Sequence, residues 1–242
     1  MLTFFSGFGL GTILTPFFAI FFPVETAIIL TAIVHFLNNI FKLFLIGKNI
    51  NYKVLLKFGL PAVLGAFAGA KLLLLLPKMT SLYEYFLLEK IHEITLINVI
   101  ISVLLIIFSL VEIIPQANKI SFTDKLVSGG IISGFFGGLS GNQGALRSIF
   151  LAKLNLSKEA FIATGVAIAC LVDVSRLSVY FSNYDKINIQ ENYNYVVVAV
   201  LSAFAGAYLG NKLLKRITLK FLQMVVSVTI ILLAIALGAG FL

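Results

Sequence analysis

The chain is poor in charged side chains, and this shortage excludes most soluble folds. Only 12% of its 242 residues are Asp, Glu, Lys or Arg, whereas 60% are hydrophobic, and the mean hydropathy is +1.07. Soluble domains carry about 25% charged residues. Because so little polar surface is available to cover a water-soluble globule, much of the surface must face lipid. We therefore predict an integral membrane protein.

Cysteine is almost absent as well. The single cysteine, Cys170, lies in an apolar run, so an intrachain disulfide is excluded and a buried structural thiol is the simplest interpretation. Residues 1–24 carry no charged side chain, which removes the positive region that a cleavable secretory signal needs.

Motifs for enzymatic or ATP-driven chemistry are missing too. The sequence has no nucleophile beside a base and no glycine-rich loop ending in Gly-Lys-Ser/Thr. Its two histidines, His35 and His92, have no thiol or carboxylate at ligand spacing. We therefore predict that the protein is not an enzyme and uses neither a cofactor nor a metal.

Long apolar runs are what the sequence does contain. A helix needs roughly 20 mostly apolar residues to cross a bilayer, and spanning segments fold as helices because lipid offers no hydrogen-bond partners. We predict an all-α integral membrane fold of about eight hydrophobic helices: Met1–Phe22, Val24–Ile46, Val54–Leu76, Ile94–Ile114, Leu126–Leu151, Ala160–Phe181, Tyr195–Leu214 and Phe221–Leu242. The longest connection, Pro77–Glu93, is expected to be a short amphipathic helix or an exposed loop.

The chain contains an internal repeat. An alignment that pairs Thr31 with Thr164 is followed by a match of residues 65–73 to 206–214, which are identical at six of nine positions. Repeated halves are a recurrent plan of transporters, with the substrate site between the halves. We predict a single transmembrane transporter domain over residues 1–242, with a first half at 1–114 and a second half at 122–242.

Each half opens with a glycine-broken helix. The first opening combines three glycines between Gly7 and Gly11 with Thr12 and Pro16, and the second places five glycines within 134–144. Unwound backbone at membrane depth must be buried in protein or line a wet cavity, where its N–H groups can bind an anion. Close helix packing through small residues is the alternative, and it is our prediction for the Gly-x-x-x-Gly pairs within 65–69 and 206–210. The substrate-binding candidates on the two openings are Thr12, Ser140, Asn142, Gln143 and Arg147; Arg147 could instead snorkel to the interface.

The second apolar segment carries a polar stripe. The spacing of Thr31, His35, Asn38, Asn39 and Lys42 places them along one side of a helix. Such side chains are costly in lipid, so the stripe should face protein or a cavity. Interhelical hydrogen bonds and solute contact both fit this pattern. Asn38 and Asn39 are the substrate-binding candidates.

The sixth apolar segment carries a charged pair. Asp173 and Arg176 are three residues apart and can pair with each other on a helix. A self-neutralising structural pair is one interpretation. The other makes Asp173 a coupling candidate that takes up and releases a proton.

The order of these motifs resembles the sulfite exporter TauE/SafE family, also called the toluene-sulfonate uptake permeases. The resemblance covers nearly the whole chain. It is carried by the opening Gly7–Gly11 leading to Pro16, by Pro23-x-x-x-Ala27-x-x-x-Thr31, by Gly47–Asn51 followed by Gly65–Ala70, and by Gly134–Gly144.

The resemblance implies an eight-segment, multi-pass carrier in the bacterial plasma (inner) membrane. Such a carrier would move sulfite, sulfoacetate or another organosulfur anion. An excess of eighteen Lys and Arg over ten Asp and Glu fits either an anionic solute or anionic lipid. Candidate partners are a small anion, the bilayer, a coupling proton or cation, and a second copy of the chain; nucleic acid is not among them. The alternative is a non-transporting membrane partner or assembly protein.

The chain also departs from the family pattern. Met1 aligns with Gly134, inside the corresponding second-half segment, so the first span is expected to be short or truncated at its start. The insert at 80–93 and the charged pair Asp173–Arg176 are not features that the resemblance implies.

Overall fold

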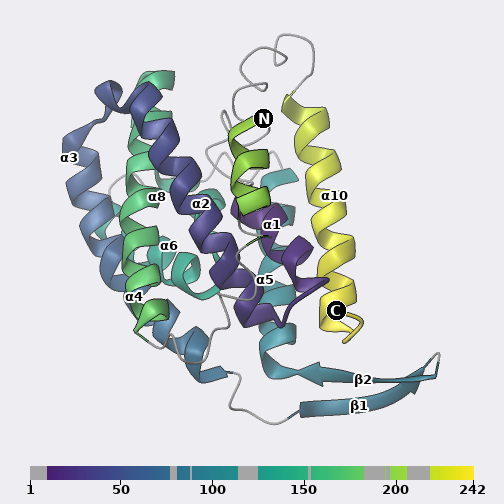
Figure 1. Ribbon diagram of the computed structural model, residues 1–242. Coiled ribbons are helices and arrows are strands. Elements are labelled where there is room, and N and C mark those ends of the chain that lie inside the picture. Colours follow the sequence, from purple (N-terminus) through teal and green to yellow (C-terminus); the bar gives the residue numbers. More distant parts are fainter. Residues whose placement is uncertain are drawn as a thin grey trace.

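The structure is a bundle of helices with one β-hairpin at one end (Figure 1). The computed structural model describes residues 10–76, 81–87, 89–113, 125–151, 154–182, 194, 197–205 and 219–242.

Among the described residues, three helical stretches are long and apolar enough to cross a membrane: Val24–Asn49, Tyr52–Leu75 and Lys158–Phe181. The first contains helix α2 (Val24–Ile46), and the third is helix α8 (Lys158–Phe181). Both were predicted as spans, so hydropathy alone located them. These results make the chain an integral, mostly helical membrane protein.

The stretch Tyr52–Leu75 contains three elements in series. Helix α3 (Tyr52–Val54) begins where the side chain of Asn51 accepts a hydrogen bond from the Val54 amide. A wider π-helical turn, η2 (Leu55–Gly59), follows and leads into α4 (Leu60–Leu75). The wider turn ends just before Pro61, which has no N–H to donate to the carbonyl four residues earlier.

Shorter apolar helices complete the described bundle. They are α1 (Leu10–Ala19), α5 (Leu96–Ile113), α6 (Leu126–Ser140), α7 (Gly144–Leu151) and α10 (Leu219–Gly238), together with helical residues 197–205. The remainder of the predicted first and seventh spans lies outside the described residues. The second copy of the repeated glycine motif, 206–214, lies there too.

The segment between α4 and α5 is a β-hairpin, so the expected amphipathic helix or loop was wrong. Strands β1 (Ser81–Leu87) and β2 (Lys90–Thr95) pair antiparallel and reach past the end of the bundle (Figure 1). Tyr85 stacks on His92 across the strands, and its hydroxyl donates to the Ala239 carbonyl at the end of α10. Cross-strand aromatic pairs of this kind stabilise hairpins.

Helices α4 and α6 approach each other through glycine. A Cβ added to Gly65 or Gly69 would collide with carbonyl oxygens of α6, and one added to Gly134 or Gly138 would collide with carbonyl oxygens of α4. The close packing predicted for Gly65 and Gly69 is therefore confirmed. Gly134 and Gly138, which we had assigned to the second break, pack in the same way within an unbroken helix.

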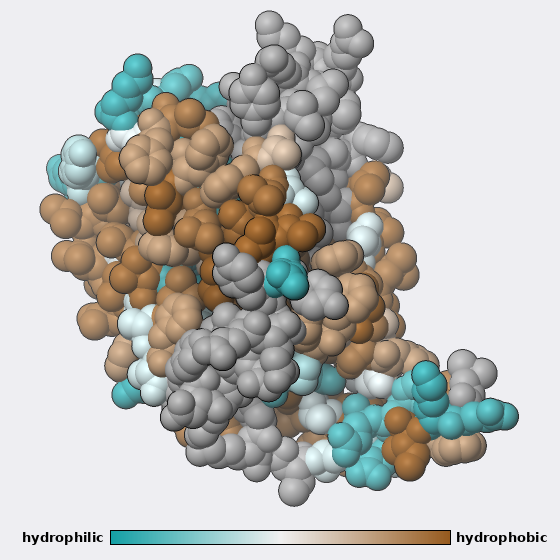
Figure 2. Space-filling view, in the orientation of Figure 1, coloured by the Kyte–Doolittle hydropathy of each residue, from teal (hydrophilic) through white to brown (hydrophobic). Residues whose placement is uncertain are grey.

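The surface has the character expected of a protein in lipid. On the face shown in Figure 2 hydrophobic residues cover most of the described part of the bundle, while hydrophilic ones gather at its upper left end and on the hairpin at the lower right. Large apolar side chains such as Phe44, Leu64 and Leu232 are 85%, 70% and 65% exposed. The described polar side chains of the candidate site are buried instead.

Candidate functional site

The second glycine-rich segment is interrupted at one point. Helix α6 ends at Ser140, Gly141 adopts φ +80°, and helix α7 begins at Gly144. A positive φ suits glycine, which has no Cβ to clash. The predicted break is thus confirmed and placed at residues 141–143, where Asn142 and Gln143 lie between the two helices.

The structure describes the first glycine-rich segment only from Leu10 onwards, so the break predicted there stays a prediction. Helix α1 runs from Leu10 to Ala19 without interruption, and Pro16 lies inside it. Proline removes one hydrogen bond near the end of this short helix but does not end it. Gly7, Gly9 and the side chain of Thr12 lie outside the described residues.

The start of α1 lies against the break. A Cβ on Gly11 would come within 3.1 Å of the Gly141 carbonyl oxygen and 3.7 Å of Cδ2 of His35 on α2. The Thr15 hydroxyl donates back to the Gly11 carbonyl at 3.0 Å. Glycine-rich stretches far apart in the sequence therefore meet beside α2.

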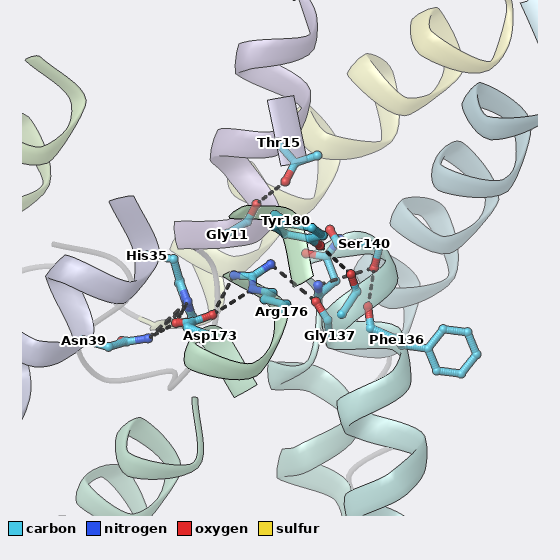
Figure 3. Close-up of polar contacts among 12 residues, drawn as sticks. Gly11, Thr15, His35, Asn39, Phe136, Gly137, Ser140, Asp173, Arg176 and Tyr180 are labelled. Atoms are coloured by element: carbon cyan, nitrogen blue, oxygen red, sulfur yellow. Dashed lines mark hydrogen bonds and ion pairs between the residues drawn. The ribbon is translucent and has the colours of Figure 1, made fainter. Parts of the chain in front are cut away.

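Asp173 of α8 is the centre of a buried polar network (Figure 3). Its Oδ1 accepts from Nε and Nη2 of Arg176 at 2.9 and 2.7 Å. Its Oδ2 is hydrogen-bonded to Nδ1 of His35 at 2.7 Å and accepts from Nδ2 of Asn39 at 3.3 Å. The predicted pair of Asp173 and Arg176 is confirmed, and the network joins α8 to the stripe on α2.

The same network reaches the last turn of α6. Nη1 of Arg176 donates to the Gly137 carbonyl at 3.3 Å, and the Tyr180 hydroxyl donates to the Gly138 carbonyl at 2.6 Å. Arg176 also lies 3.0 Å from the position that a Cβ on Gly141 would take. The charged pair is therefore fixed directly beside the helix break.

Two further cations are buried near this network. Lys42 of α2 is 4% exposed and Arg147 of α7 is 3% exposed, so neither has snorkelled to the interface. They lie within electrostatic range of each other, and Arg147 also lies within range of Asp173. The charged side chains that the described residues bury are thus three cations and one carboxylate.

Several buried amides have polar atoms without a hydrogen-bond partner among the described residues. Both amide atoms of Asn38 and of Gln143 are in this state, as is Oδ1 of Asn142. Asn38 is 1% exposed and Gln143 is 2% exposed. Burying a polar group without a partner costs about 1–3 kcal/mol in proteins, so these amides are suited to a polar solute or water.

Other predicted residues are already used within the protein. The Ser140 hydroxyl donates to the Phe136 carbonyl at 2.9 Å, one turn back on its own helix, and Asn39 belongs to the Asp173 network. His35 and Lys42 were part of the stripe but not among our site candidates. The helical spacing that selected Asn38 and Asn39 also indicated these two.

The described residues contain no group of three or more His, Cys, Asp or Glu side chains that could hold a metal ion.

The fold and the buried polar cluster define a multi-pass integral membrane protein with a charged interior at a helix break. Residues 1–237 match a model of the sulfite exporter TauE/SafE family, and the chain belongs to this family. Membership implies a membrane transporter or exporter of sulfur anions. No curated protein and no solved structure matched the chain.

Proposed function

We propose that the protein is a secondary carrier of a small sulfur-containing anion in the bacterial inner membrane. Sulfite, sulfoacetate and other organosulfur anions are the candidate solutes. The anion would bind at the break between α6 and α7, where the polar stripe of α2 faces α8. Its contacts would come from Asn38, Lys42, Asn142, Gln143 and Arg147.

The observation that carries this proposal is the excess of positive charge that the described residues bury. Lys42, Arg147 and Arg176 are buried together with a single carboxylate, that of Asp173, which pairs with Arg176. An anion would add negative charge and hydrogen-bond acceptors to this cluster. A cationic substrate would be repelled from the same place.

The helix break supplies neutral donors as well. The first N–H groups of α7 have no carbonyl partner within the helix, and a helix N-terminus favours negative charge. The amides of Asn142 and Gln143 lie directly before it. Sulfonate and sulfite present several acceptor oxygens, which matches a site made of N–H donors.

Two related halves, 1–114 and 122–242, would form the single transporter domain. The contacts of the short helices α1 and α7 support this arrangement, because each contacts the last helix of the other half. Helix α1 contacts α2 and also α10, the last helix of the second half. Helix α7 contacts α8 and also α5, the last helix of the first half. Sites between repeats are the common plan of secondary transporters.

The charge proposal is tested by replacing one lysine in each of two environments. Lys42→Met removes a buried cation, whereas Lys57→Met makes the same chemical change at an exposed position of η2. In proteoliposomes, uptake of radiolabelled sulfite should fall at least about tenfold for Lys42→Met and stay at the wild-type rate for Lys57→Met. Equal rates for the two variants would remove Lys42 from the site.

The transport proposal itself is tested with the wild-type protein. Flux of sulfite, sulfoacetate or another sulfonate into proteoliposomes, above that of empty liposomes, is the expected result. If no anion of such a panel moves under an imposed proton or sodium gradient, a non-transporting membrane partner becomes the better interpretation.

A further inference from the structure

We propose that Asp173 is an internal competitor of the transported anion, and that proton uptake by the His35–Asp173 pair releases Arg176 to bind it. This inference rests on the proposed function and assigns its coupling step. It follows from the hydrogen bonds that both carboxylate oxygens of the buried Asp173 accept.

The groups around Asp173 form a complete site for an oxyanion. Its Oδ1 accepts two hydrogen bonds from the guanidinium of Arg176, and its Oδ2 is bonded to the imidazole of His35 and the amide of Asn39. Guanidinium, imidazole and amide donors bind sulfonate and sulfite oxygens as readily as carboxylate oxygens. The carboxylate thus takes the place that a substrate oxyanion would need.

Burial limits how this network can exchange protons. The side chains of Asp173 and Arg176 are fully buried, whereas that of His35 is 12% exposed. His35 is also hydrogen-bonded directly to Oδ2 of Asp173. The imidazole of His35 is therefore the ionisable, partly exposed partner through which a proton would reach the carboxylate (Figure 3).

The titratable and charged groups near the pair come from three helices. Arg147 of α7 and Cys170, Arg176 and Tyr180 of α8 lie within electrostatic range of Asp173, and Lys42 of α2 lies within range of Arg147. Helix α6 contributes the Gly137 carbonyl, which already accepts from Arg176. Protonation of the pair leaves these cations in place. It removes the negative charge of Asp173, which would otherwise repel the transported anion.

Charge balance then couples proton uptake to binding of the anion. One proton taken up by the His35–Asp173 pair offsets one negative charge of the entering anion, so the net charge of the cluster changes by one unit less than it would without the proton. The released guanidinium turns its two hydrogen bonds from Asp173 to the anion, and the proton leaves with the anion on the other side. Binding of each ligand favours binding of the other, as linkage requires.

The first test measures protons released or taken up when the purified wild-type protein binds sulfoacetate. Both acidic groups of this probe are ionised at neutral pH, so any proton uptake belongs to the protein. In a weakly buffered detergent solution, uptake of about one proton per bound anion is expected from the linkage. Binding without proton uptake would overturn the inference and leave the proposed function intact.

The second test removes the competitor. Asp173→Asn should bind sulfoacetate about tenfold more tightly than wild type at pH 8, without proton uptake, and should lose proton-driven accumulation in proteoliposomes. Glu159→Gln is the matched control, since it neutralises an exposed carboxylate on the same helix. It should behave as wild type. A variant that still accumulates anion with the proton gradient would overturn the role of Asp173.

Folding of the variant is checked by size-exclusion chromatography. Should Asp173→Asn not fold, the wild-type proton count still decides the question. If the wild-type protein neither binds nor transports any sulfonate or sulfite, the proposed function fails, and this inference fails with it.

Discussion

Two helix interfaces at the centre of the molecule are built on opposite principles. Helices α4 and α6 touch backbone to backbone, because glycines on each helix leave room for carbonyl oxygens of the other. Helices α2 and α8 meet through charged and amide side chains centred on Asp173. Both interfaces lie in a bundle that faces lipid. Steric fit holds α4 against α6, whereas hydrogen bonds and ion pairs hold α2 against α8.

This difference indicates which interface can change during a transport cycle. Backbone contact through glycine has one close-packed arrangement, so α4 and α6 should move as a unit. A network of ionisable side chains can be rearranged by a proton or by a competing anion. We therefore expect the rigid part of the carrier at α4–α6 and the solute-dependent part at α2–α8. Substitutions in the two interfaces should have different consequences.

The largest effect is expected from Gly69→Leu. A side chain at this position would collide with the Phe135 carbonyl, and a backbone group cannot move aside without separating the helices. The yield of monodisperse protein in fluorescence-detected size exclusion should fall to near zero. Ala68→Leu, at the neighbouring exposed position, is the control and should keep the wild-type yield. Normal yield for Gly69→Leu would mean that the two backbones are not in contact.

The next effect is expected from Arg176→Met. It leaves the buried carboxylate of Asp173 without its guanidinium partner, and breaking a buried pair in this way costs about 3–5 kcal/mol. The double variant Asp173→Asn/Arg176→Met removes both charges and should recover much of that loss. Thermal unfolding midpoints in detergent measure the difference. Equal midpoints for the single and double variants would show that the pair contributes little.

Part of this arrangement could be predicted from the sequence. Hydropathy located α2 to the residue, because the apolar run begins after Pro23 and ends at Gly47. Helical periodicity placed His35, Asn38, Asn39 and Lys42 on one side, and the structure buries the last three. These features depend on neighbouring residues within one segment.

Features that depend on distant residues could not be predicted in the same way. The contact of His35 with Asp173 joins positions 138 residues apart, and spacing within one helix does not identify the partner on another. The role of Gly134 and Gly138 was missed because glycine serves both breaks and close packing. The hairpin was missed because the alternating segment is short and its partners lie at the end of α10.

A smaller effect on stability, but a clear one on transport, is expected from Gln143→Leu. Both of its amide atoms are buried without a partner among the described residues, so the substitution removes a desolvation cost. The thermal midpoint should stay the same or rise, while sulfite flux falls several-fold. Ser227→Ala also removes a buried, unpartnered hydroxyl, but on α10. This variant should raise the thermal midpoint without a loss of sulfite flux. A normal rate for Gln143→Leu would place the solute elsewhere.

The smallest effect is expected from Ser140→Ala. This variant separates polar side chains that hydrogen-bond within the protein from those that contact the anion. The Ser140 hydroxyl donates to the Phe136 carbonyl on its own helix and accepts from the Asn142 amide at 3.4 Å, so its hydrogen bonds serve the end of α6. We expect a loss of stability of about 1 kcal/mol and a change in sulfite flux below about twofold. A fall in flux as large as that of Gln143→Leu would mean that the hydroxyl contacts the anion. The solute site would then extend from α7 back across the break to α6, the helix fixed against α4.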